Sequence, residues 1–187
     1  MVEGPVVGDP AVMSPSEHQH TLLLLRHSKA EPGPDKRDVD RALSDRGRRD
    51  AAAVGEWLAE QGLAMDLVVC STSTRTRQTW EVAVDGGAEA DDVWFDRRVY
   101  QADADTLLEV IRETPEEATV LMVVGHAPGV PALVDDLMAE TGGSTLAIAR
   151  LEEGFPTSGL AALTFEGEWA GLSPGDAELE DFVAPRG

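Results

Sequence analysis

Apolar residues in this chain gather in short continuous runs separated by longer stretches with helical periodicity. The runs are too short and too uniformly apolar for amphipathic helices, so they predict strands buried on both faces. The strands predicted in this way are residues 21–26, 67–71 and 119–126, and residues 93–99 look like a further strand. The predicted helices are residues 44–62, 74–84, 104–114 and 128–140. Strands that alternate with helices predict an α/β fold of three layers, α/β/α, around a mostly parallel central sheet.

Polar and glycine residues at the ends of the predicted helices agree with these boundaries. Ser44 can cap the first helix and Gly62 can end it, while Asp103 or Asp105 can cap the third. The C-terminal segment changes in character. Residues 159–172 hold an apolar run, a turn at Glu-Gly and a second arm with a tryptophan, and residues 178–185 predict one more edge strand.

The first twenty residues show no periodicity and are rich in Pro, Gly and Ser, which predicts a flexible tail over 1–20 and a single domain over 21–187. His18 and His20 would then be solvated, since two histidines alone make a weak metal site.

Cys70 lies inside a predicted strand and is expected to be buried and unreactive. We expect the four tryptophans to pack in the core; they are Trp57, Trp80, Trp94 and Trp169.

Composition narrows the class of protein. No run approaches the roughly 20 apolar residues of a membrane helix, and the N-terminus does not resemble a signal peptide, so we expect a cytoplasmic protein. The formal charge of −20 argues against binding to nucleic acid or to an acidic membrane surface. Twelve of the 15 basic residues precede residue 99, so any anion site is expected in the first half of the chain.

Four nitrogen-bearing side chains follow the predicted strands. Arg26 and His27 end the first strand, Arg75 follows the second, and His126 follows the strand over 119–126. Ligands of parallel sheets bind beyond the carboxyl ends of the strands, so these side chains are expected to converge. Each could also have a plainer role, as a surface ion pair, a solvated arginine at a helix start or a loop histidine.

Two guanidinium groups and two imidazoles suit a phosphoryl group. Guanidinium forks match phosphate oxygens, and a histidine nitrogen can attack phosphorus to form a phosphohistidine. No acidic cluster accompanies these residues, so the arginines would neutralise the phosphoryl group in place of a metal, and neither a metal nor a cofactor is expected.

The segments "LLLLRHSKA", "LVVCSTSTRTRQT" and "MVVGHAPG" resemble the signature segments of the histidine phosphatase (phosphoglycerate mutase-like) superfamily, and the chain is most similar to its SixA-type phosphohistidine phosphatases over residues 21–186. The resemblance implies a phosphoglycerate mutase-like fold. It also implies His27 as the phosphorylated nucleophile and a phosphate pocket formed by Arg26, Arg75 and His126, with Arg41 also able to reach the phosphate.

The chain departs from the superfamily pattern at two positions: Ser28 stands where glycine is the norm, and Ala127 where asparagine is frequent. A proton donor is also missing from the motifs, with Asp103, Glu31 and Asp40 as candidates. The weak P–N bond of phosphohistidine can take its proton from solvent, whereas an alkyl ester needs a placed acid. The lack of an evident proton donor therefore favours phosphohistidine substrates.

Three functions remain open on the sequence. The leading one is a metal-independent phosphatase that dephosphorylates histidine on a protein partner, such as a phosphotransfer domain or a phosphocarrier. A second is a phosphatase that uses the same chemistry on a small phosphorylated metabolite. Such an enzyme needs a lid over its substrate, and the loop over 31–43 is the only obvious source of one. A third is a phosphate-binding module without turnover.

Overall fold

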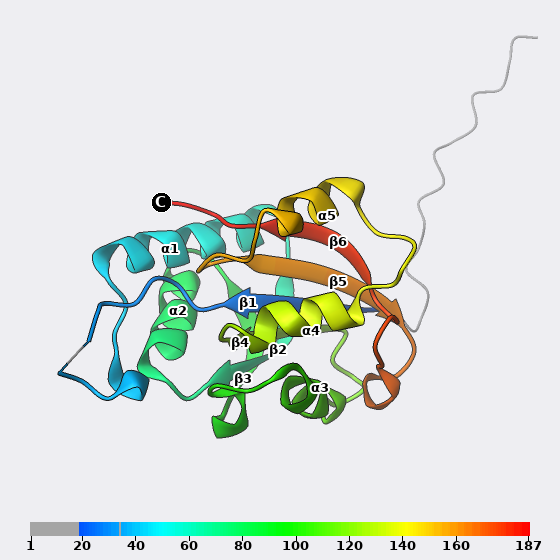
Figure 1. Cartoon of the computed structure of the whole chain (residues 1–187), viewed down its shortest axis with the longest axis horizontal. Helices are drawn as coiled ribbons and strands as arrows, with labels where there is room; N and C mark the ends of the chain where they lie inside the picture. The colour runs from blue at the N-terminus through cyan, green and yellow to red at the C-terminus, as the bar shows by residue number, and fades with distance from the viewer. Residues whose placement is uncertain (1–18, 34) are drawn as a thin grey trace, which may run out of the picture.

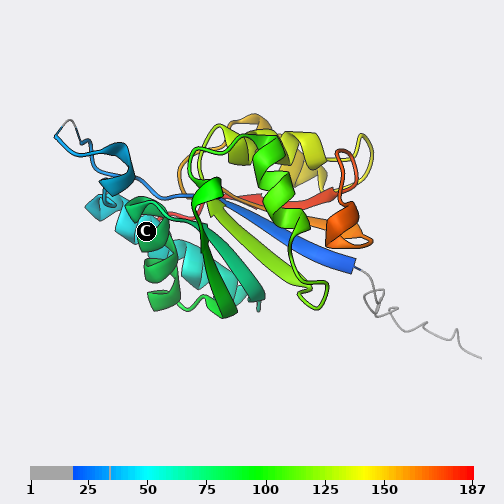
Figure 2. The same ribbon diagram turned by 90° about the horizontal axis from the view of Figure 1, so that it is seen from below.

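The computed structural model of the chain describes residues 19–33 and 35–187 and arranges them as one sheet between two layers of helices (Figures 1 and 2). Within this part the strands are β1 (Gln19–Arg26), β2 (Ala64–Ser71), β3 (Glu89–Asp96), β4 (Val120–Gly125), β5 (Leu160–Glu166) and β6 (Glu178–Val183). The α-helices are α1 (Asp45–Glu60), α2 (Thr74–Asp85), α3 (Ala104–Arg112), α4 (Gly129–Leu137) and α5 (Thr145–Glu152). The predicted three-layer α/β/α fold is confirmed.

The order of strands in the sheet is β3-β2-β4-β1-β5-β6. Strands β1 to β4 run parallel, β5 is antiparallel to β1, and β6 is antiparallel to β5. Arg26 pairs with Gly125, and Cys70 pairs with Val124. The carboxyl ends of β1, β2 and β4 therefore meet at one edge of the sheet.

The four consecutive leucines of β1 bury their side chains on both faces of the sheet. Leu22 and Leu24 pack with α3 and α4, while Leu23 and Leu25 pack with α1 and α2. All four are fully buried. Successive side chains of a strand point to opposite faces, so a central strand covered on both sides needs an unbroken apolar run. This packing fixes the position of the residues that follow Leu25.

Polar side chains cap the first three helices, and two of these caps, Ser44 and Asp103, are the ones that the sequence predicts. The side chain of Ser44 accepts a hydrogen bond from Gly47 N at the start of α1, and Asp103 does the same for Thr106 N at α3. Ser73 caps α2 by accepting from Thr76 N. Each cap satisfies one of the free amide groups of a first turn.

Strand β1 begins at Gln19, so the predicted boundary of the tail at residue 20 is wrong. His20 is buried, pairs with Phe165 of β5 and lies with its ring 4.8 Å from that of Trp169, between centroids. The antiparallel partner β5 extends the strand beyond the apolar run, which periodicity alone does not reveal. The rest of the predicted tail, including His18, lies outside the described residues.

Three other segments differ from the sequence predictions. Helix α5 was not predicted, because its eight residues are short and lie between glycines. The arm expected around Trp169 is a 3₁₀ helix, η3 (Trp169–Gly171), and β3 ends at Asp96, where a second one, η2 (Arg97–Val99), begins. Short 3₁₀ turns depend on how the flanking elements pack, so a local pattern does not identify them.

The tryptophans divide between core and surface. Trp80 and Trp169 are buried and Trp57 is half-buried, but Trp94 is 42% exposed, so its predicted core position is wrong. The reason is that β3 is an edge strand. Cys70 is buried as predicted, and burial raises the pKa of its thiol to about 12. In the described part of the chain, no helix is long and apolar enough to cross a membrane.

Helices α1 and α2 approach each other closely at Gly55, where a Cβ atom would overlap the carbonyl oxygen of Ala83. We expect Gly55→Ala to lower the free energy of unfolding by about 2 kcal/mol, because a backbone atom cannot give way without moving a helix. Urea unfolding measures the change. Gly171→Ala is the control, since its Cβ would meet no atom within 4 Å. Equal stability of the two variants would contradict the prediction.

Candidate active site

The four predicted side chains lie at the edge of the sheet where β1, β2 and β4 end. His27 follows β1 directly and its amide donates to Gly125 O at 3.0 Å, which ties it to the end of β4. Arg75 stands in the first turn of α2, and His126 follows β4. The rings of His27 and His126 lie 5.1 Å apart between centroids. The predicted convergence of these three residues is therefore present in the structure.

Hydrogen bonds define the tautomer of His27. Its Nδ1 lies 2.8 Å from the carbonyl oxygen of Ser28, which can only accept, so Nδ1 carries the proton. Its Nε2 is then unprotonated, and its lone pair accepts a hydrogen bond from Arg75 Nε at 3.2 Å. The side chain is partly exposed. A lone pair on a reachable nitrogen is what nucleophilic attack requires.

His126 takes the opposite tautomer. Arg75 donates from a terminal nitrogen to Nδ1 at 3.2 Å, which leaves the proton on Nε2, and Nε2 donates to Ser71 Oγ at 2.8 Å. The hydroxyl group of Ser71, which the sequence analysis did not single out as a site residue, therefore orients this imidazole. Its place at the last position of β2 was the only signal in the sequence.

Burial and nearby cations keep both imidazoles neutral. Burial is the largest cause that lowers the pKa of His27, to about 4, and the charges of Arg75, Arg26 and Arg41 lower it further. Burial also lowers the pKa of His126 to about 3, helped by the charges of His27 and Arg75. At neutral pH both rings therefore have unprotonated nitrogens among fixed positive charges.

Arg26 is held in place by a backbone carbonyl group. Its NH1 donates to the carbonyl oxygen of Phe155 at 2.6 Å. Its Nε is buried and has no hydrogen-bond partner among the described residues. Burial lowers the pKa of this guanidinium. Arg26 therefore has donor capacity left for an anion placed beside His27.

Arg41 does not contact either imidazole. Its Nε donates to Glu31 O at 3.0 Å and its NH1 donates to Asp38 Oδ1 at 3.0 Å. Asp38 also accepts from Arg75 NH2, at 3.0 Å, and thus joins the two arginines. The sequence reasoning missed Asp38, because it stands in an irregular loop with several other acidic residues.

The three acidic residues proposed as proton donors lie away from His27. Asp103 caps α3, Asp40 accepts from Arg37 at 2.7 Å, and Glu31 pairs with Lys36 at 3.9 Å. The side chains of the two residues that depart from the superfamily pattern contact neither His27 nor His126 in any hydrogen bond of the described residues, and Ser28 meets His27 only through its backbone carbonyl group. Ser28 is buried with its hydroxyl 2.6 Å from that of Ser158, and Ala127 is exposed beyond His126.

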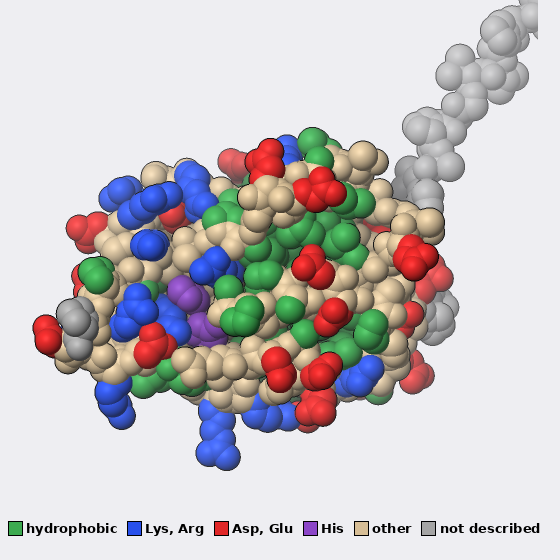
Figure 3. Space-filling view, viewed as in Figure 1, with side chains coloured by type: hydrophobic (Ala, Val, Ile, Leu, Met, Phe, Trp, Pro, Cys, Tyr) green, Lys and Arg blue, Asp and Glu red, His purple; other side chains and the backbone are tan. Residues whose placement is uncertain are grey.

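Cations surround this edge of a strongly acidic protein. Figure 3 shows histidine side chains at the surface with Lys and Arg side chains gathered around them, while Asp and Glu spread over the rest of that face. A local positive field of this kind draws anions to the site despite the net charge of −20. Among residues 19–33 and 35–187, no group of three or more His, Cys, Asp or Glu side chains is placed to hold a metal ion.

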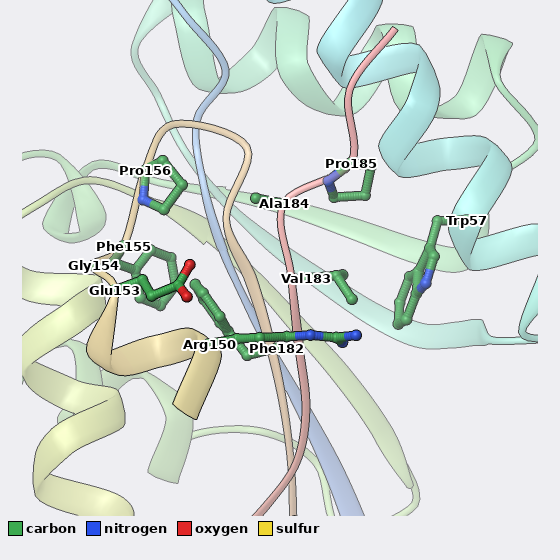
Figure 4. Close-up of a pocket in the computed structure, with 10 residues that line it drawn as sticks. All are labelled: Trp57, Arg150, Glu153, Gly154, Phe155, Pro156, Phe182, Val183, Ala184 and Pro185. Carbon is green, nitrogen blue, oxygen red and sulfur yellow. The ribbon is translucent and has the colours of Figure 1, made fainter. Parts of the chain in front are cut away.

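An open groove of about 690 Å³ lies at the same edge of the sheet. Figure 4 shows Trp57 of α1 on one side, Phe155 and Pro156 on the other, and the segment Val183–Pro185 between them. Phe155 connects the groove with the candidate active site, because it lines the groove and its carbonyl group accepts a hydrogen bond from Arg26. The groove is mostly apolar and is therefore suited to apolar side chains.

Comparisons with known proteins agree with this geometry. A family model described as the histidine phosphatase superfamily (branch 1) matches residues 22–99, a stretch that includes Arg26, His27 and Arg75. The chain is 35% identical to a SixA protein from Nakamurella multipartitia, a candidate phosphohistidine phosphatase, with a TM-score of 0.77 over 89% of this chain and 96% of that one. The chain belongs to the histidine phosphatase superfamily.

Within the superfamily, the chain is a phosphatase of the SixA-type group. It is 32% identical to a candidate SixA from Agrobacterium tumefaciens, with a TM-score of 0.72 over 89% of this chain and 99% of that one. An uncharacterised protein of Mycobacterium tuberculosis is 39% identical over 87% of this chain and all of its own length.

The neutral state of His126 predicts a loss of stability in acid. Below pH 6.5 the histidine in the unfolded chain takes up a proton, whereas the folded one does so only near pH 3. The unfolded state thus binds more protons, and the free energy of unfolding falls as the pH falls. Between pH 7 and pH 5 we expect the free energy of unfolding to fall by about 2 kcal/mol more in wild type than in His126→Gln, as measured by urea unfolding. Parallel losses would contradict the assignment.

Proposed function

We propose that this protein removes phosphoryl groups from phosphohistidine on a partner protein, through a phosphorylated His27. The single observation that carries the proposal is the unprotonated Nε2 of His27, which stands at a partly exposed position and accepts a hydrogen bond from Arg75 Nε at 3.2 Å. Nucleophile and cation are thus in place before any substrate binds. Such preorganised charge is a large contribution to catalysis.

The reaction proceeds in two displacements at phosphorus. First, the Nε2 lone pair attacks phosphorus, and the bond from phosphorus to the leaving nitrogen breaks with its electron pair. That nitrogen belongs to the imidazole of the partner protein, which has taken a proton from solvent. Water then attacks phosphorus, the P–Nε2 bond breaks, and its electrons return to His27 as phosphate leaves. Arg26 and Arg75 stabilise the charge on the phosphoryl oxygens, and His126 holds Arg75 in place by accepting a hydrogen bond from it.

The surroundings of His27 support a protein substrate. The nucleophile is reachable from solvent and lies at the same edge of the sheet as the apolar groove. Val183, which lines the groove, pairs with Leu160, and Leu160 pairs with Leu25, two residues before His27. The groove and the end of β1 are therefore two strand spacings of about 4.8 Å apart. Residues that flank a phosphohistidine on a folded partner can reach that far.

A substrate panel tests the chemistry and the substrate class. We expect wild type to dephosphorylate a phosphohistidine protein faster than a hexose phosphate, and to form an acid-labile phosphoryl adduct with an aryl phosphate. His27→Ala removes the nucleophile and lowers turnover of every substrate by at least about 10³-fold. A preference for the sugar phosphate, or labelling that survives in His27→Ala, would refute the proposal.

The groove makes a separate prediction about the partner. We expect Trp57→Ala to lower kcat/KM about tenfold on the phosphohistidine protein, because apolar contacts to the partner are lost, and to leave kcat/KM on an aryl phosphate within twofold. Trp94→Ala is the matched control, since this exposed tryptophan stands on the opposite edge strand β3. The groove has no part in recognition if both variants behave alike.

A further inference from the structure

Asp38 lies against the cations of the site, although the two displacements proposed above do not use it. It begins a short 3₁₀ helix, η1 (Asp38–Asp40), in the loop between β1 and α1. Its Oδ2 accepts from the hydroxyl of Tyr100 at 2.8 Å and from Arg75 NH2 at 3.0 Å, and its Oδ1 accepts from Arg41 NH1 at 3.0 Å. Three donors from three segments thus fix one carboxylate.

A single guanidinium separates this carboxylate from the nucleophile. Arg75 donates from Nε to His27 Nε2 at 3.2 Å and from NH2 to Asp38 at 3.0 Å. A phosphoryl group attacked by His27 has its leaving atom on the side opposite the attacking nitrogen. Asp38 is a carboxylate one guanidinium away from that nitrogen, whereas Asp103, Asp40 and Glu31 are engaged elsewhere.

We propose that Asp38 is the general acid and base of this site, and that it allows the enzyme to cleave phosphate esters with poor leaving groups as well as phosphohistidine. The proposal rests on the proposed phosphoryl transfer to His27. It assigns a catalytic role to the loop over residues 31–43, which supplies Asp38 and Arg41 to the site.

Substrate binding shifts Asp38 towards its protonated form, and the proton comes from solvent. Without substrate the carboxylate is ionised, because hydrogen bonds from Tyr100, Arg41 and Arg75 lower the pKa of Asp38 to about 2. A bound phosphoryl group competes for the donors of Arg75 and places negative charge beside Asp38. Both changes favour the protonated carboxyl, since loss of a cation and approach of an anion each raise a carboxyl pKa. Arg41 and Tyr100 remain to hold the group in place.

Proton and electron transfers balance over the two steps. As His27 Nε2 attacks phosphorus, the bond from phosphorus to the ester oxygen breaks with its electron pair, and that oxygen takes the proton of Asp38 and leaves as an alcohol. Asp38, now a carboxylate, accepts a proton from the water that attacks phosphorus. The P–Nε2 bond then breaks and phosphate leaves, after which Asp38 releases its proton to solvent and returns to the ionised form of the free site.

Tyr100 is a positioning residue in this scheme. Its ring meets that of His126 edge-on, with 5.5 Å between centroids, and its hydroxyl donates to Asp38. The same ring lies 5.8 Å from the guanidinium carbon of Arg75. It therefore links the carboxylate to the wall of the phosphate pocket without contacting the reacting atoms.

The dependence of rate on leaving group tests the proposal. p-Nitrophenyl phosphate releases an anion that is stable at neutral pH, whereas phenyl phosphate releases a phenol with a pKa of about 10 and needs the acid. In Asp38→Asn we expect kcat/KM to fall less than tenfold on the nitrophenyl ester and at least about 10²-fold on the phenyl ester. Asp40→Asn is the control, since this carboxylate in the same helix pairs with Arg37 and, among the described residues, has no hydrogen bond to Arg75 or His27.

The remaining outcomes are distinct. Equal losses on both esters, or no loss on phenyl phosphate, would overturn the role of Asp38, because a residue that merely shapes Arg75 would slow both substrates alike. Absence of activity on a phosphohistidine protein would refute the proposed substrate and leave Asp38 standing. Absence of a phosphoryl adduct on His27 with either ester would overturn both proposals.

Discussion

Arg75 enters the site from the first turn of α2 with a side chain that is almost completely buried. A buried guanidinium must have its donors satisfied, and here the acceptors are His27, His126 and Asp38. The rest of the site depends on these three contacts of Arg75. They fix the tautomers of both imidazoles, help keep them neutral, and hold the loop that carries Asp38 against the edge of the sheet.

The neutral imidazoles show how burial and charge act together. A histidine beside a carboxylate alone would gain a proton, but these two rings lie among arginines and are largely out of water, so both influences favour the neutral form. The cost is a protein that is less stable in mild acid. Function therefore opposes stability at the same few residues, as is common where strongly perturbed groups cluster.

The scaffold explains why such a site can be rigid. The four leucines that precede Arg26 pack into both cores of the molecule, so the tip of β1 cannot shift without disturbing both layers of helices. Serine hydroxyls add fixed contacts around the site, from Ser71 to His126 and from Ser28 to Ser158. The serine that replaces the glycine typical of the superfamily is thus accommodated by a partner on a distant loop.

The sequence by itself determined the layers, the buried parallel strands β1, β2 and β4, and the identity of the residues at their ends, because strands buried on both faces need unbroken apolar runs and the carboxyl ends of parallel strands share one edge. It could not determine the start of β1, the helix α5 or the exposure of Trp94, since these depend on which strand lies at an edge and which is paired. Only the tertiary structure placed Asp38, Ser71 and Tyr100 in the site. Their roles come from hydrogen bonds between segments far apart in the chain, and no local pattern encodes such contacts.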